Sequence, residues 1–124
     1  MSKTSQAVLA AIQAGQALSQ EDFYNCNFSR LELQNANFQG ATFLRANLSG
    51  ANLNQANLSG SDLRGANLAG ANLQQANLRE ACLYRVDLSG ADLSGADLTD
   101  VKLQNARYDS ATVFPEGFAY KSSG

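Results

Sequence analysis

The chain has 124 residues, 44% of them hydrophobic, with 11 acidic and 9 basic residues, no histidine and a formal net charge of −2. This length fits one domain with an ordinary core. A nearly balanced charge argues against a nucleic-acid-binding or membrane-surface protein, because both need concentrated positive charge.

The N-terminal region predicts a short helix and no membrane span. Residues 4–14 place Val8, Leu9, Ala11 and Ile12 on one side of a helix that Gly15 would end. The apolar run at residues 7–12 is far too short to cross a bilayer, and flanking glutamines make it a poor signal peptide. We expect residues 1–15 to form a capping helix; a partner-binding helix is the alternative.

Leucine or phenylalanine then occupies every fifth position from Leu18 to Leu103, and the register continues at Tyr108, Val113 and Phe118. Alanine usually lies two positions earlier, with Asn or Asp between the two. A helix needs apolar spacings of three and four and a flat strand needs two, so a period of five fits neither. In residues 46–50, Ala46 and Leu48 point inward, and Ser49 and Gly50 suit a bend. A repeated bend of this kind predicts an all-β solenoid with a dry axis.

The strings at residues 46–50, 51–53, 91–95 and 96–100 follow the pattern A-(N/D)-L-x-x. Over residues 16–115 the chain therefore resembles the pentapeptide repeat family. The resemblance implies a right-handed quadrilateral β-helix with four pentads per coil. About five coils, stacked at ~4.8 Å, would make a shaft of roughly 24 Å. Residues twenty apart would then lie one above another.

We find no catalytic, cofactor-binding or metal-binding motif, and we expect a protein that is not an enzyme. Because the chain has no histidine, the carboxylates are the remaining candidates for a general base. Asp87, Asp92 and Asp97 would lie on three successive sides of the coil and could not converge on one metal ion. Cys26 occupies an inward position and Cys82 an outward one. They would lie about three coils apart, too far for a disulfide between them. Two such cysteines favour a cytoplasmic location.

One side of the predicted coil differs from the others in composition. Stacking at twenty would align Tyr24, Leu44, Arg64 and Tyr84, with Arg45 and Arg85 at the adjoining corner. Tyrosine, leucine and arginine are typical of protein contacts. We predict a protein-contact surface there, with chance clustering as the alternative.

Residues 116–124 predict a C-terminal capping tail, disordered over residues 121–124. Phe114, Phe118 and Tyr120 bring aromatic side chains to this end. They could cover the last coil, or they could form an end-to-end homodimer contact, as the resemblance implies for some family members. The sequence leaves monomer and homodimer open.

The function expected is a non-enzymatic structural or interaction module whose partner is another protein, not a nucleic acid or a membrane. The resemblance also implies an alternative, a DNA mimic that binds DNA gyrase. A mimic ~24 Å long would need about fourteen uncompensated negative charges, because B-DNA carries one per ~1.7 Å. The net charge is −2, which disfavours the mimic.

Overall fold

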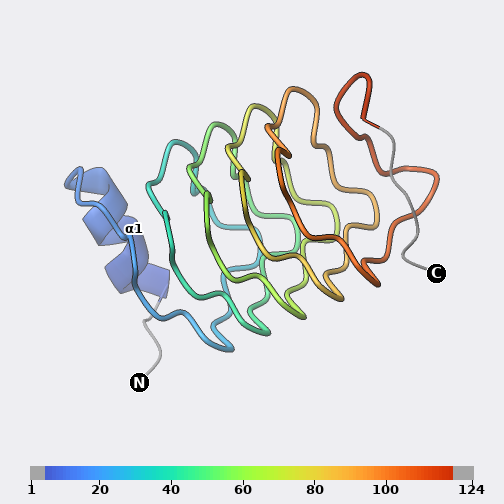
Figure 1. Ribbon diagram of the computed structural model, residues 1–124. Coiled ribbons are helices and arrows are strands. Elements are labelled where there is room, and N and C mark those ends of the chain that lie inside the picture. The colour runs from blue at the N-terminus through green and yellow to red at the C-terminus, as the bar shows by residue number, and fades with distance from the viewer. Residues whose placement is uncertain (1–4, 119–124) are drawn as a thin grey trace.

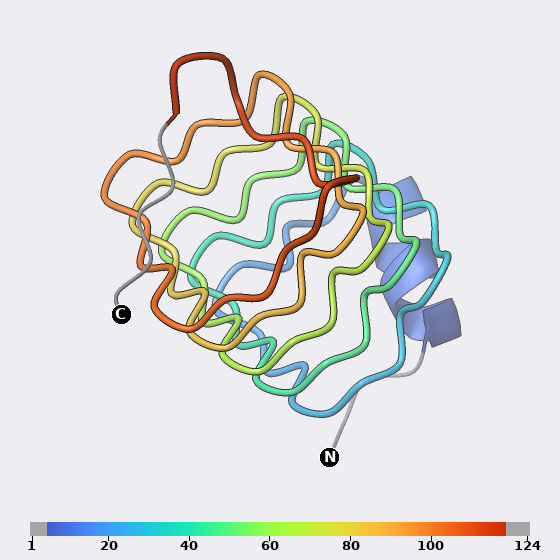
Figure 2. The same ribbon diagram turned by 90° about the vertical axis from the view of Figure 1, so that its right-hand side faces the viewer.

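The computed structural model describes residues 5–118. A single helix, α1 (Ser5–Gln13), is followed by a chain that bends every five residues. Figure 1 shows α1 at one end of a stack of coils, and Figure 2 shows that the coils share a roughly four-sided outline. Between the bends the described chain forms only isolated β-bridges, because each extended segment ends before a longer strand can form.

The coils are held in register by parallel bridges between residues twenty apart. The second residue of a pentad uses both of its backbone groups: Asn67 N–H donates to Ala46 O at 2.9 Å, and Asn67 O accepts from Leu48 N–H at 2.7 Å. The predicted stacking at twenty is therefore confirmed. One ladder runs through Asp22, Thr42, Asp62, Cys82 and Lys102.

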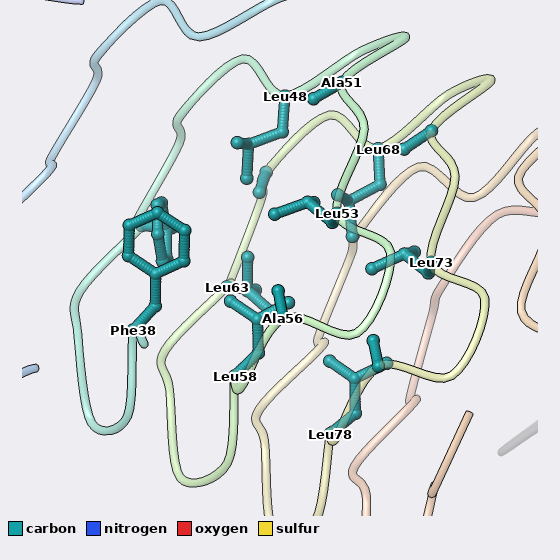
Figure 3. Close-up of a cluster of buried hydrophobic side chains, with 14 of the residues drawn as sticks. Phe38, Leu48, Ala51, Leu53, Ala56, Leu58, Leu63, Leu68, Leu73 and Leu78 are labelled. Carbon is teal, nitrogen blue, oxygen red and sulfur yellow. The ribbon is translucent and has the colours of Figure 1, made fainter. Parts of the chain in front are cut away.

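The third residue of each pentad fills the axis of the shaft (Figure 3). The Leu and Phe side chains at these positions from Phe23 to Leu93 are 0% exposed, and alanines line the same interior. Four phenylalanines form one cluster near the N-terminal end, with the rings of Phe38 and Phe43 5.1 Å apart and edge to face. The axis is thus aromatic in its first coils and aliphatic from Leu48 to Leu98.

The bends depend on a left-handed residue at the end of each pentad. These residues have φ between 59° and 71°, and many are not glycine, such as Arg45 and Gln55, both at 61°. The turn closes with a hydrogen bond such as Ala51 N–H to Leu48 O at 3.1 Å. A positive φ at the second central residue is what a type II turn requires.

The Asn or Asp of the pentad supports this turn, a role that the sequence analysis missed. Its Oδ1 accepts the backbone N–H two residues later, as in an Asx-turn. Asn47 Oδ1 accepts from Ser49 N–H at 3.0 Å and from Ser49 Oγ at 2.7 Å. The same N–H to Oδ1 bond forms at Asp22, Asn27, Asn37, Asn52, Asn57, Asp62, Asn67, Asn72, Asn77, Asp87, Asp92 and Asp97.

At the N-terminal end, α1 lies against the first coil. Val8 is 1% exposed, and Leu9, Ala11 and Ile12 pack against the core. The helix ends in a Schellman motif: Gly15 N–H donates to Ile12 O and Gln16 N–H to Ala11 O, both at 2.9 Å. Gly15 has φ 74°, which suits a residue without Cβ.

At the C-terminal end the predicted register is wrong. Val113 pairs with Asp92, twenty-one residues away, and is 46% exposed, while Tyr108 is 48% exposed. Neither residue lines the axis as predicted; Phe114, one residue later, packs against the core instead. Phe118 also packs there and stacks on Phe114, whereas Tyr120 and residues 121–124 lie outside the described residues.

Asp109 explains the shift in register. In the regular shaft Gly70 N–H donates to a backbone carbonyl, Ser89 O, nineteen residues later. Gly90 N–H donates instead to the carboxylate of Asp109 at 3.0 Å. The same carboxylate accepts Ala111 N–H at 3.0 Å, and Thr112 Oγ1 donates to Leu88 O at 2.8 Å. Side chains thus replace backbone partners where one extra residue enters the coil.

Candidate functional site

The residues predicted to form a contact surface lie together on one side of the shaft. We call this the tyrosine–arginine side: pentads 21–25, 41–45, 61–65, 81–85 and 101–105. Successive coils are joined along it by Asn25 N–H to Leu44 O, Arg45 N–H to Arg64 O and Gly65 N–H to Tyr84 O. The fourth positions of these pentads therefore form one column: Tyr24, Leu44, Arg64 and Tyr84.

Apolar and aromatic atoms are accessible along this column. Tyr24 is 46% exposed, while Leu44 and Tyr84 are half-buried. Because their backbones belong to a hydrogen-bonded coil, these side chains project from a rigid wall and would lose little backbone entropy on binding.

Arg64, in the same column, is engaged by a neighbour. Its Nε donates to Asp62 Oδ1 at 2.9 Å, and its terminal nitrogen donates to Oδ2 at 2.7 Å. The Arg64 side-chain hydrogen bond holds the pKa of Asp62 below its ordinary value, and Asp62 raises the pKa of Arg64. The pair therefore stays charged at neutral pH, and its contribution to stability falls only as the pH drops through the lowered pKa of Asp62.

Arg45 and Arg85 at the adjoining corner are different. Both are exposed, and within residues 5–118 neither guanidinium has an ion-pair partner. The corner residue between them is Gly65, and a Cβ built there would lie 3.6 Å from Arg45 Cγ. The stem of Arg45 thus lies against the next coil, which is the coil between Arg45 and Arg85.

Charge is distributed unevenly around the shaft. The tyrosine–arginine side carries three acidic residues, Glu21, Asp22 and Asp62, and four basic residues, Arg45, Arg64, Arg85 and Lys102. The opposite side, pentads 31–35, 51–55, 71–75 and 91–95, carries two acidic residues and no base. The sequence analysis missed Lys102, although stacking at twenty from Cys82 would have found it.

Cys82 interrupts the Asx-turns on the tyrosine–arginine side. It is half-exposed and pairs with Asp62 and Lys102 in the backbone ladder. Cys26 is buried, as predicted, and both thiols are free. A cysteine offers no strong acceptor to the turn N–H of Tyr84.

We expect Cys82→Asn to stabilise the fold by about 0.5–1.5 kcal/mol, because the new amide oxygen can accept the Tyr84 N–H. Equilibrium unfolding in guanidinium chloride measures the change. Cys82→Ala removes the thiol without adding an acceptor and is the matched control. Equal stability of the Asn and Ala variants would show that the turn gains nothing from the acceptor.

The other acidic residues singled out in the sequence do not meet. Asp87, Asp92 and Asp97 pair with Asn67, Asn72 and Asn77 on three different sides, and residues 5–118 hold no group of three ligands suited to a metal ion. Hydrogen bonds from the Ser89 N–H, the Ser94 hydroxyl and the Thr99 hydroxyl lower the pKa of Asp87, Asp92 and Asp97, respectively. Carboxylates of this kind are weak bases and remain ionised at neutral pH.

The aromatic residues predicted at the C-terminal end form a cluster. The rings of Phe114 and Phe118 are stacked at 5.5 Å, and Tyr108 meets Phe114 edge to face at 5.6 Å.

At the other end of the shaft, a hollow of about 500 Å³ lies between α1 and the first coil. It is lined by Leu9, Ile12, Gln13, Arg30, Leu31, Glu32 and Gln34. Among the described residues no helix has the length and apolarity needed to cross a bilayer.

Comparison with known proteins gives consistent results. The family model for pentapeptide repeats matches with eight copies, at residues 14–45, 46–83 and 81–107. A comparison with curated proteins found no match.

Three solved structures are similar. A pentapeptide repeat protein from the thylakoid lumen of Arabidopsis thaliana is 31% identical, with a TM-score of 0.73 over 77% of this chain and 67% of that one. A pentapeptide repeat protein from Nostoc PCC 7120 is 36% identical, with a TM-score of 0.62 over 94% and 88%. HetL, involved in heterocyst differentiation regulation in Nostoc sp. strain PCC 7120, is 33% identical, with a TM-score of 0.66 over 79% of this chain but only 49% of HetL.

Proposed function

Because this chain belongs to the pentapeptide repeat family, we propose that it is a non-enzymatic structural or protein-interaction module whose contact surface is the tyrosine–arginine side. One observation carries the proposal: accessible Tyr24, Leu44 and Tyr84 lie in one column beside two arginines that have no ion-pair partner among residues 5–118. Tyrosine and arginine are the residues most often found at the energetic centre of protein interfaces.

We also infer the fold details that the family implies. Members of the family are right-handed quadrilateral β-helices, and we assign this chain about five coils, with α1 as the N-terminal cap. The twenty-residue bridges and the burial of Val8 support this assignment. The cap would shield the apolar end of the shaft from water.

A non-enzymatic role is supported by the chemistry of the carboxylates. Their turn hydrogen bonds lower their pKa values and occupy their oxygens. They also lie on separate sides of the shaft, so the three carboxylates do not converge on one substrate atom. A DNA mimic that binds gyrase remains the alternative, but four basic residues on one side weaken the resemblance to a uniformly charged duplex.

The partner we propose is another protein, rather than a nucleic acid or a membrane, and the location we propose is cytoplasmic. Two free thiols, Cys26 and Cys82, support a reducing compartment. The chain would act as a monomer or as an end-to-end homodimer through Phe114 and Phe118, which light scattering on the purified protein distinguishes.

Photo-crosslinking in native cell extract tests the contact surface. We expect Tyr84→p-benzoylphenylalanine to crosslink to one specific protein, and Leu44→Ser in the same chain to reduce the yield about ten-fold, as for an interface anchor. The matched control is Asn54→p-benzoylphenylalanine, in the corresponding turn position of the opposite side. Equal crosslinking from positions 84 and 54 would remove the tyrosine–arginine side as the contact surface. Loss of DNA supercoiling activity when the protein is added to gyrase would favour the alternative.

A further inference from the structure

We infer that the corner formed by Arg45, Gly65 and Arg85 binds two carboxylates of an acidic, extended segment of the partner protein. This inference rests on the proposed function of the tyrosine–arginine side and specifies the chemistry of its partner.

The backbone places the two arginines on one line. Corner residues of successive coils stack at ~4.8 Å, so the backbones of Arg45 and Arg85, two coils apart, are about 10 Å apart. The stem of Arg45 lies over Gly65 and covers part of this separation. A Cβ at position 65 would make an ordinary van der Waals contact with Arg45 Cγ, so the Arg45 stem lies directly against this coil.

The charges of the corner are not compensated within the described residues. The Arg64 guanidinium donates two hydrogen bonds to the Asp62 carboxylate and forms a bidentate ion pair with it. Arg45 and Arg85 have no such partner, and two neighbouring cations repel each other. An anion that contacts both would relieve the repulsion, and a guanidinium binds a carboxylate with two parallel hydrogen bonds.

The surroundings of the corner favour a peptide over a nucleic acid. Carboxylates two residues apart on an extended chain are about 6.8 Å apart, which is within reach of two long arginine side chains whose backbones are about 10 Å apart. The residue between the two carboxylates would point away from the corner, whereas an apolar residue two positions further along would share their face and could contact Leu44 or Tyr84, both half-buried. A DNA-binding protein typically contacts about six to ten phosphates, which exceeds the basic residues available on this side.

Fluorescence anisotropy with a defined probe tests the inference. The probe is a fluorescein-labelled decapeptide of alternating Glu and Leu, compared with one of alternating Gln and Leu. We expect the Glu/Leu peptide to bind at least about ten-fold more tightly at low salt. Arg45→Gln/Arg85→Gln should remove that advantage. Gln55 and Gln75 already occupy corner positions with φ 61° and 62°, so this variant should fold.

Arg30→Gln/Arg79→Gln is the matched control, because it removes the same charge from other sides of the shaft; its affinity should stay within about two-fold. Equal losses in the two double variants, or no binding of the Glu/Leu peptide, would overturn the inference. Tighter binding of a labelled DNA duplex through the same arginines would also overturn it. If Arg45→Gln/Arg85→Gln still crosslinks from position 84, the contact surface stands and only the acidic-segment inference fails.

Discussion

Leu68→Asp is expected to unfold the shaft. Leu68 is 0% exposed and lies on the axis one coil after Leu48 (Figure 3). Truncation of a buried leucine to alanine alone costs about 2–5 kcal/mol. Aspartate adds the cost of burying a carboxylate among aliphatic side chains, and the sum exceeds much of the roughly 5–15 kcal/mol that stabilises a typical domain. Circular dichroism during heating should show no cooperative transition at neutral pH.

Two variants separate the buried charge from other causes. Leu68→Met keeps the volume and should cost less than about 1.5 kcal/mol. Ser49→Asp introduces the same charge at a half-buried turn position and should leave a cooperative transition. A folded Leu68→Asp protein with an unchanged melting temperature would contradict the continuous dry axis, and the structural basis for the tyrosine–arginine side would fail with it.

Phe38→Ala is expected to cost about 3–5 kcal/mol. Phe38 is 0% exposed, and its ring packs edge to face against Phe23 at 5.7 Å and Phe43 at 5.1 Å. Removal of the ring leaves a cavity and ends both aromatic contacts, which are worth about 0.5–1.5 kcal/mol each beyond burial. Equilibrium unfolding in guanidinium chloride gives the free-energy difference.

Phe38→Leu is the matched control for this site. Leu58 and Leu78 occupy the same position in the next two coils, so the backbone there accepts leucine. We expect the Leu variant to lose clearly less stability than the Ala variant. If both lose the same amount, the specific packing of the aromatic cluster, rather than its volume, determines stability at this end of the shaft.

The predictions for Leu68 and Phe38 both concern a stack in which each coil contacts only the neighbouring coils. Stability lost at Phe38 therefore acts first on the N-terminal coils and α1, whereas Leu68 lies in the middle of the stack. This difference matters for function, because Tyr24 and Tyr84 belong to different coils of the same contact column. A local weakening near Phe38 would disturb Tyr24 before it disturbs Tyr84.

The sequence by itself determined the interior of this protein. A bulky apolar residue at every fifth position, with alanine two before it, requires a chain that winds around one axis, since no other geometry buries them all. That argument placed Leu48 and Leu68 inside, Cys26 inside and Cys82 outside. The alignment of Tyr24 with Tyr84 came from the family resemblance, which implies four pentads per coil. This prediction of the interior succeeded because the inward positions depend only on local geometry: in a short extended segment, residues two apart point to the same side.

Only the tertiary structure decided the register of the last coil and which charged side chains on the surface pair with each other. Val113 moved outward because the Asp109 carboxylate accepts the Gly90 N–H from the coil beneath, a contact between residues far apart in sequence. Likewise, two arginines on the same side differ in role: Arg64 forms an ion pair with Asp62, whereas the stem of Arg45 lies against Gly65 of the next coil. Such outcomes depend on which side chains reach each other between coils, and a repeat pattern does not encode those distances.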